Sequence, residues 1–202
     1  MYQLLGYLSG IVSLLALPPY LRDIFKRTTR PQRTSWFIWS LLGSVAFASQ
    51  FAEGARASLW MTGAETLGAL GVFIISLYLG EGGFSKRDAL AIIIACIGLV
   101  LWYLTRQAVF ALFFVILVDA AGTALTLVKA YKDPDSETLS AWMLASLAGA
   151  FAAGAVGKWN LILLAYPVYI FTANLAICLA IFLGKRRVPL EGGSFSSKKD
   201  EL

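Results

Sequence analysis

The sequence predicts an all-α integral membrane protein in which seven helices cross the bilayer, and three observations lead to that prediction. The chain is 58% apolar with a mean hydropathy of +0.72, whereas soluble domains are about 45–50% apolar. Only 14% of residues are charged. These charges separate nearly uncharged runs of roughly 17–24 residues, the length needed to cross a hydrocarbon core about 30 Å thick. The third observation is that Lys and Arg are sorted to one side of those runs.

Each run is expected to be a helix, because backbone amides in lipid have to be paired within their own segment. In chain order the expected helices cover 2–21, 35–52, 59–79, 88–105, 108–128, 138–156 and 160–183. The first begins near Met1 with neither a basic leader nor an Ala-x-Ala cleavage pattern, so it is expected to be retained. Every later helix is bounded by a short stretch with charged or turn residues, such as Glu53-Gly54 and Gly157-Lys158.

The basic residues give the expected orientation. The basic side chains of alternate loops and of the tail are Arg22, Lys26, Arg27, Arg30, Arg33, Lys86, Arg87, Lys129, Lys132, Lys185, Arg186, Arg187, Lys198 and Lys199. Of the 17 Lys and Arg residues, the opposite face has only Arg56, Arg106 and Lys158. The positive-inside rule therefore places the N-terminus outside and the C-terminus in the cytoplasm, and favours seven spans over six. The net charge of +5 then needs no nucleic-acid partner.

Several classes of function lack the residues they need. The chain has no His, and its two cysteines, Cys96 and Cys178, both lie in apolar runs. Neither a disulfide framework nor a metal-ligand spacing is present, so we expect no metal and no cofactor. Without a nucleophile and base pair, an enzyme is not expected. The last span contains no Lys for a retinal Schiff base, which argues against a photoreceptor.

An internal repeat relates the two halves of the chain. The segment from Trp36 to Gly43 and the segment from Trp142 to Gly149 share the pattern Trp-x-x-x-Ser-Leu-x-Gly. We therefore predict two three-helix bundles, 1–80 and 108–184, joined by a linker helix in 81–107 and followed by a flexible cytoplasmic tail, 185–202. One extra crossing makes the two bundles parallel, a 3+1+3 plan with a pseudo-twofold axis along the membrane normal.

The chain resembles the PQ-loop and SWEET/SemiSWEET transporters. The resemblance rests on Leu17-Pro18-Pro19-Tyr20, the basic Lys26-Arg27-Thr28 and the start of the second helix at Thr34-Ser35-Trp36. It implies alternating access between two bundles, with Pro18 and Pro19 as a hinge where the family has Pro-Gln. It also implies a substrate contact at Asn174, which matches an Asn on the third helix of each family unit. Unit one has Leu70 there instead.

Polar groups inside the spans are the candidate site. An ionisable residue costs about 2.5–3.5 kcal/mol at a helix centre and normally faces a bundle interior. Asp119 is followed at helical spacing by Gly122, Thr123 and Thr126, so one helix face is polar. Such a carboxylate could bind a cation, hydrogen-bond a solute or exchange a proton, or it could only tie helices together. Glu65 could line an external vestibule, or its side chain could snorkel to the surface.

These residues predict a transporter or facilitator of a small polar solute, with proton coupling through Asp119 left open. The expected substrate-binding residues are Asp119, Thr123, Asn174, Glu65, Trp36 and Trp142, although the two tryptophans could instead be interfacial anchors. The expected hinges are Pro18, Pro19 and Pro167, since a helical proline frees a backbone carbonyl. The alternative is a structural or sensory bundle that moves no solute.

The expected surroundings follow from this topology. The partners are the lipid bilayer and the solute, and whether copies form a homo-oligomer is left open. A bacterial inner membrane is the expected location. The chain ends Lys199-Asp200-Glu201-Leu202, which matches a signal for retention in the endoplasmic reticulum lumen. On the predicted topology this sequence lies in the cytoplasm, where the lumenal receptor cannot bind it.

Overall fold

A computed structural model describes residues 1–27, 31, 33–80, 83 and 85–192, and within them the regular structure is entirely helical. The helices are α1 (Tyr2–Leu15), α2 (Leu17–Phe25), α3 (Arg33–Ala52), α4 (Leu59–Leu79), α5 (Lys86–Thr105), α6 (Ala108–Lys132), the 3₁₀ turn η1 (Pro134–Ser136), α7 (Leu139–Ala155) and α8 (Leu161–Gly192). Each apolar run expected to be a helix is one, although the first is interrupted.

Four helical stretches are long and apolar enough to cross a membrane by length and composition: Tyr2–Phe25, Leu59–Leu79, Ala108–Lys132 and Leu161–Arg186. Shorter apolar helices cover Ile92–Thr105 and Leu139–Ala155. Helix α3 is not among them, because it begins at Arg33 and contains several Ser residues and Gln50. An all-helical chain with membrane-length helices is thus confirmed for the described residues, whereas the seven crossings stay a prediction.

The first expected helix, 2–21, divides into α1 and α2 at Ala16. Pro18 and Pro19 occupy the first turn of α2. Neither proline has a backbone N–H, so the carbonyls of Leu14 and Leu15 lose the donors that would continue α1. The other end of the chain also differs from expectation. Helix α8 begins after Asn160, whose Oδ1 accepts from the backbone N–H of Ile162 and Leu163 at 3.0 and 3.1 Å, and it continues past the expected boundary at 184 to Gly192.

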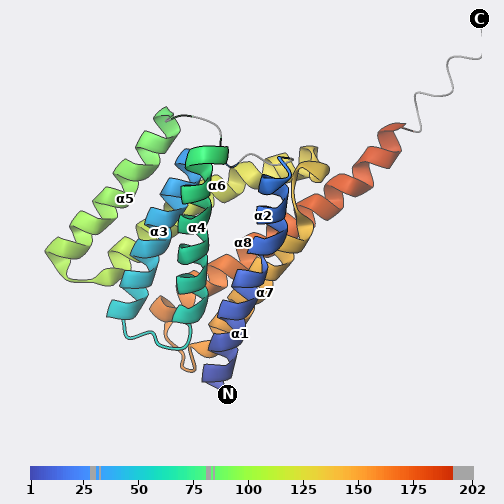
Figure 1. The fold of residues 1–202 in the computed structure, drawn as a ribbon. Coiled ribbons are helices and arrows are strands. Elements are labelled where there is room, and N and C mark those ends of the chain that lie inside the picture. Colours follow the sequence, from blue (N-terminus) through green and yellow to red (C-terminus); the bar gives the residue numbers. More distant parts are fainter. Residues whose placement is uncertain (28–30, 32, 81–82, 84, 193–202) are drawn as a thin grey trace, which may run out of the picture.

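The helices pack in two groups of three (Figure 1). In the first group α4 lies between α1 and α3, and in the second α8 lies between α6 and α7. The groups meet where α1 packs on α7 and α3 packs on α6. Helix α5 lies at the edge of the bundle and packs against α6 and α3. Consecutive long helices run in opposite directions, so their connections alternate between the two ends of the bundle.

The glycines of the internal repeat occupy the same place in both groups. A Cβ atom at Gly43 would lie 2.6 Å from Oγ1 of Thr66 on α4. A Cβ atom at Gly149 would lie 2.6 Å from the backbone N of Phe171 on α8. Both positions are therefore points where the second helix of a group comes closest to the third, as small residues allow in membrane bundles.

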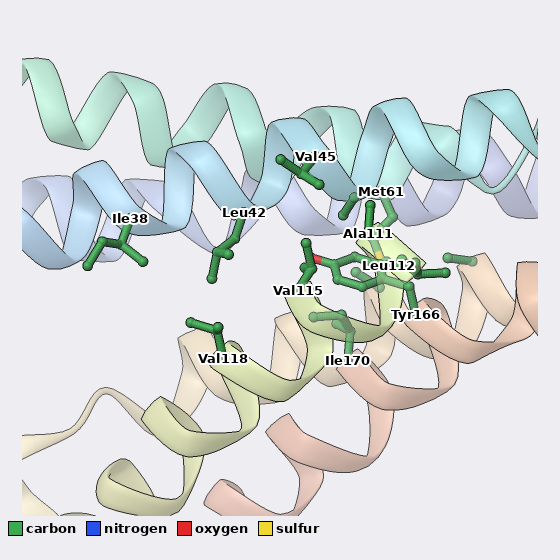
Figure 2. Packing of buried hydrophobic residues seen from close by; sticks show 13 residues of the cluster. Ile38, Leu42, Val45, Met61, Ala111, Leu112, Val115, Val118, Tyr166 and Ile170 are labelled. Carbon is green, nitrogen blue, oxygen red and sulfur yellow. The ribbon is translucent and has the colours of Figure 1, made fainter. Parts of the chain in front are cut away.

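A buried apolar cluster fills one end of the space between the groups. Figure 2 shows Val45 of α3 and Met61 of α4 near Leu112 of α6, with Tyr166 of α8 beside them. Met61, Leu112 and Tyr166 lie in the first turns of their helices, and Val45 lies in the second half of the antiparallel α3. These members lie at the end of the bundle where α4, α6 and α8 begin, and Val118 and Ile38 extend the cluster toward the other end (Figure 2).

Many hydroxyl groups in the helices bond to their own helix. Ser40 donates to the Trp36 carbonyl at 2.7 Å, Ser49 to the Val45 carbonyl at 2.7 Å, and Thr66 to the Thr62 carbonyl at 2.7 Å. These bonds reach back one turn, a common arrangement for Ser and Thr in helices. The hydroxyls are thus satisfied without a partner helix.

Candidate functional site

A cavity of about 250 Å³ lies between the two groups of helices. Its wall includes α1, α3 and α4 from the first group and α6, α7 and α8 from the second. All six residues predicted to bind a substrate line it: Asp119, Thr123, Asn174, Glu65, Trp36 and Trp142. Residues from five helices, α3, α4, α6, α7 and α8, are therefore brought to one space, while their role in binding stays a prediction.

Asp119 is held in a short chain of hydrogen bonds that joins α6 to α8. The hydroxyl of Tyr169 donates to Oδ2 of Asp119 at 2.5 Å. Thr123 Oγ1 lies 3.1 Å from the same Tyr169 hydroxyl. A phenol has one proton, which Tyr169 gives to Asp119, so Thr123 is the donor in the second bond. The predicted polar face of α6 lines the cavity with Asp119, Gly122, Thr123 and Thr126.

Glu65 approaches the same space from α4. Its carboxyl group has Ser13 of α1 as a hydrogen-bonding neighbour and is close enough to interact electrostatically with Asp119. The Glu65 side chain extends from α4 toward α1 and α6. It therefore lines the cavity between the two groups of helices and does not snorkel to the surface. Two carboxyl groups from different halves of the chain therefore line one cavity.

Asn174 of α8 is 8% exposed and faces the cavity together with residues one or two turns away, Tyr166, Ile170 and Ile177. Its Nδ2 donates to the Ile170 carbonyl at 2.7 Å. A carbonyl can only accept, so this bond identifies the amide nitrogen, and Oδ1 is the atom left for another partner. Seven residues earlier, Pro167 is fully buried, and its carbonyl oxygen would lie 3.1 Å from a Cβ at Gly149.

Tryptophan rings line the end of the cavity opposite the apolar cluster. The indole N–H of Trp36 donates to the Tyr20 hydroxyl at 3.3 Å, and that of Trp142 donates to Glu137 at 3.1 Å. Trp39 packs edge-on against Trp36 with 5.0 Å between ring centroids, and it also lines the cavity. These rings lie against the cavity, so an interfacial anchoring role does not account for their whole environment.

The predicted hinge prolines lie at the cavity's edge. Ala16 and Leu17, which line the cavity, immediately precede Pro18 and Pro19. A change in angle between α1 and α2 would therefore move part of the wall. Whether these prolines act as hinges stays a prediction.

A larger hollow of about 860 Å³ has different chemistry. It lies on the outer side of α1, α3 and α4, and its wall is apolar apart from Arg56 and a few hydroxyls. Trp60 and Leu67, which line it, are exposed. This hollow has no cluster of polar side chains from both halves and faces the surroundings of the bundle, so we assign the candidate site to the smaller cavity.

Three aromatic residues of the site were missed from the sequence: Trp39, Tyr166 and Tyr169. Tyr166 lies eight residues before Asn174, on the same face of the helix, so extending that face would have found it. Trp39 follows Trp36 by three residues and could have been found in the same way. The bond between Tyr169 and Asp119 depends on how α6 and α8 are aligned, for which the sequence has no signal.

Comparison of the chain with protein-family models, curated proteins and solved structures gave no match. The resemblance to PQ-loop and SWEET transporters therefore stays a prediction. Within the described residues, no group of three or more His, Cys, Asp or Glu side chains is placed to hold a metal ion. The site is defined by carboxyl, amide, hydroxyl and indole groups alone.

Proposed function

We propose that the protein is a membrane transporter that moves a small polar solute through the central cavity by alternating access. The observation that carries this proposal is the cavity itself. Its polar lining residues come from both halves of the chain, and its wall shares Leu42, Val115, Tyr166 and Ile170 with the buried apolar cluster. Polar side chains inside a membrane bundle are costly and usually mark the path of a solute or ion.

The packing of the helices supports a 3+1+3 arrangement. In each group the third helix lies in the middle, and the first helix of each group packs on the second helix of the other. A pseudo-twofold axis between two parallel units produces this reciprocal packing of first helix on second helix. With α1 and α2 counted as one crossing and α5 as the linker, the bundle has seven crossings.

The distribution of charge supports the orientation. The described basic residues Lys26, Lys86, Lys129 and Lys185 lie at the end of the bundle where α2, α4 and α6 finish. Arg56, Arg106 and Lys158 lie at the other end, with the N-terminus. In an inner membrane this arrangement puts the N-terminus outside and the tryptophan end of the cavity toward the cytoplasm. On this orientation the apolar cluster is the proposed outer gate.

Uptake by proteoliposomes tests the proposal. Purified wild-type protein is reconstituted and assayed with labelled sugars, amino acids, amines and organic acids, with and without an imposed proton gradient. We expect one class to accumulate, and Asp119→Asn to reduce uptake at least tenfold. Asp135→Asn is the matched control, because that carboxylate is exposed and its described ion pair is with exposed Lys185. If the wild type takes up no compound of the panel, the protein is instead a structural or sensory bundle.

A further inference from the structure

The wall of the central cavity has acidic groups and no basic ones among its described residues. Glu65 and Asp119 both line it, and neither Lys nor Arg does. The chain contains no His. The described ion pairs of the protein involve residues at the helix ends, such as Lys129 with Glu137. An ionised carboxylate in this space therefore finds no positive side chain in the cavity wall.

Several of the hydrogen-bond donors around the cavity are used by the protein itself. The hydroxyls of Thr123 and Tyr169 are committed to the chain that ends at Asp119. The indole N–H groups of Trp36 and Trp142 donate to Tyr20 and Glu137, outside the cavity wall. Two carboxyl groups in one wall favour a solute that has more donors than acceptors, whereas a sugar has both in similar numbers.

Acceptors are what the lining leaves over. One hydrogen of the Asn174 Nδ2 is donated to the Ile170 carbonyl, and the Oδ1 of this buried residue can accept from a donor in the cavity. When ionised, the carboxylates of Glu65 and Asp119 are acceptors only. A protonated amine has N–H donors and no acceptor, so it complements this set through hydrogen bonds and charge, and a quaternary ammonium group complements it through charge.

The indole rings add a second feature that suits a cation. Trp36, Trp39 and Trp142 line one end of the cavity. The faces of Trp rings attract ammonium groups by about 0.5–2 kcal/mol, and aromatic cages are a common means of recognising quaternary amines. The cavity volume, about 250 Å³, is below the range of about 300–1,000 Å³ for drug-sized ligands, which points to a small solute.

We infer that the transported solute is a small organic monocation, with its ammonium group between Glu65 and Asp119, Asn174 as a further acceptor, and the tryptophans around its apolar part. This inference rests on the proposed function. Binding of a cation would also neutralise charge that is costly inside a membrane. The Tyr166 hydroxyl lines the cavity and can donate to an oxygen on the same solute.

Binding to the purified full-length protein tests the inference. The probes are choline, its neutral carbon analogue 3,3-dimethyl-1-butanol, glucose and pyruvate, and binding is measured by isothermal titration and by quenching of tryptophan fluorescence. We expect choline to bind at least tenfold more tightly than the analogue, with which it shares shape and hydroxyl. Glu65→Gln and Asp119→Asn should each weaken choline binding at least tenfold, and Asp135→Asn should leave it unchanged.

A measurement on the wild type covers the case in which a carboxyl variant does not fold. A hydrophobic carbodiimide modifies buried carboxyl groups, and mass spectrometry of the peptide with Glu65 reports the extent. Choline should slow this modification, and the neutral analogue should not. Equal binding of choline and its analogue, or equal protection by both, would overturn the inference.

The two proposals fail in different ways. Asp119-dependent uptake of a sugar or an organic acid would refute the organic cation and leave transport standing. Binding of choline without uptake of any probe would support the cation site and refute transport. Absence of both binding and uptake for every probe would refute both.

Discussion

The two three-helix groups share their packing and differ in their chemistry. Gly43 and Gly149 occupy equivalent points of close approach, and Trp36 and Trp142 both line the cavity. The carboxyl groups, however, come from different helices of each group, Glu65 from the third helix of one and Asp119 from the first helix of the other. The glycines at the helix contacts and the cavity tryptophans therefore occur in both groups, whereas each carboxyl group occurs in one group only.

The comparison extends to the first helix of each group. In the first group the first helix is interrupted before Pro18 and Pro19, which divides it into α1 and α2. In the second group the first helix, α6, is continuous from Ala108 to Lys132. The first group therefore contributes an interrupted helix to the cavity wall, and the second group contributes a continuous one. The following variants test how the two groups differ, in order of decreasing expected effect on stability.

The largest effect is expected from the repeat glycines. In Gly149→Ala the new methyl meets backbone atoms of Phe171, which cannot move aside, so we expect destabilisation of about 1–3 kcal/mol, as for an overpacked core. In Gly43→Ala the methyl meets the Thr66 hydroxyl, a side-chain group that can rotate, so the cost should be smaller. Thermal unfolding in detergent measures both. Gly71→Ala is the control, since no other group lies within 4 Å of its Cβ position. Equal costs at 43 and 149 would contradict the interpretation.

The next effect concerns the end of α4. Arg33 donates to the carbonyls of Ser76 and Gly80 at 2.9 and 2.8 Å, which joins the start of α3 to the end of α4. Arg33→Ala should cost about 1–2 kcal/mol, because charged donors to helix carbonyls are among the stronger hydrogen bonds. In the second group, Lys185 pairs with Asp135 at the surface, and Lys185→Ala should cost at most about 0.5 kcal/mol. A larger loss from Lys185→Ala than from Arg33→Ala in thermal unfolding would reverse the comparison.

Tyr169→Phe removes the donor that Asp119 receives from α8. Hydrogen bonds between membrane helices average about 0.6 kcal/mol and reach about 1.7 kcal/mol, so we expect a loss of about 1 kcal/mol in unfolding experiments. Tyr166→Phe is the matched control, because Tyr166 lies one turn away on the same helix and no hydrogen bond of its hydroxyl is described. A loss no greater than that of the control would mean that the bond contributes nothing to stability.

The smallest effect on stability is expected at the bend. Replacing Pro18 and Pro19 by Ala restores the donors for α1 and should leave stability unchanged or slightly raised. If the bend moves during transport, uptake should fall several-fold. Thermal unfolding and uptake measured on the same preparation separate the two effects. Undiminished uptake would show that α1 and α2 need not bend.

The sequence was sufficient for most of the helices and for part of the site. Long apolar runs predict helices because lipid demands internal pairing of the backbone, and Asp119 and Asn174 were found because polar groups stand out in such runs. Tyr169 was not found, since a tyrosine in an apolar helix is ordinary and its bond to Asp119 depends on how two helices are aligned. The break at Ala16 could have been predicted, because two adjacent prolines cannot continue a helix.

The hydroxyls that bond back to their own helix have a consequence for biogenesis. Ser40, Ser49 and Thr66 present no unsatisfied group to lipid even before the helices meet. The insertion machinery can therefore release these segments one at a time, and assembly can follow within the bilayer. Glu65 and Asp119 find their described partners on other helices. Their helices are the ones for which the order of synthesis matters, since Asp119 is made before the tyrosine that pairs with it.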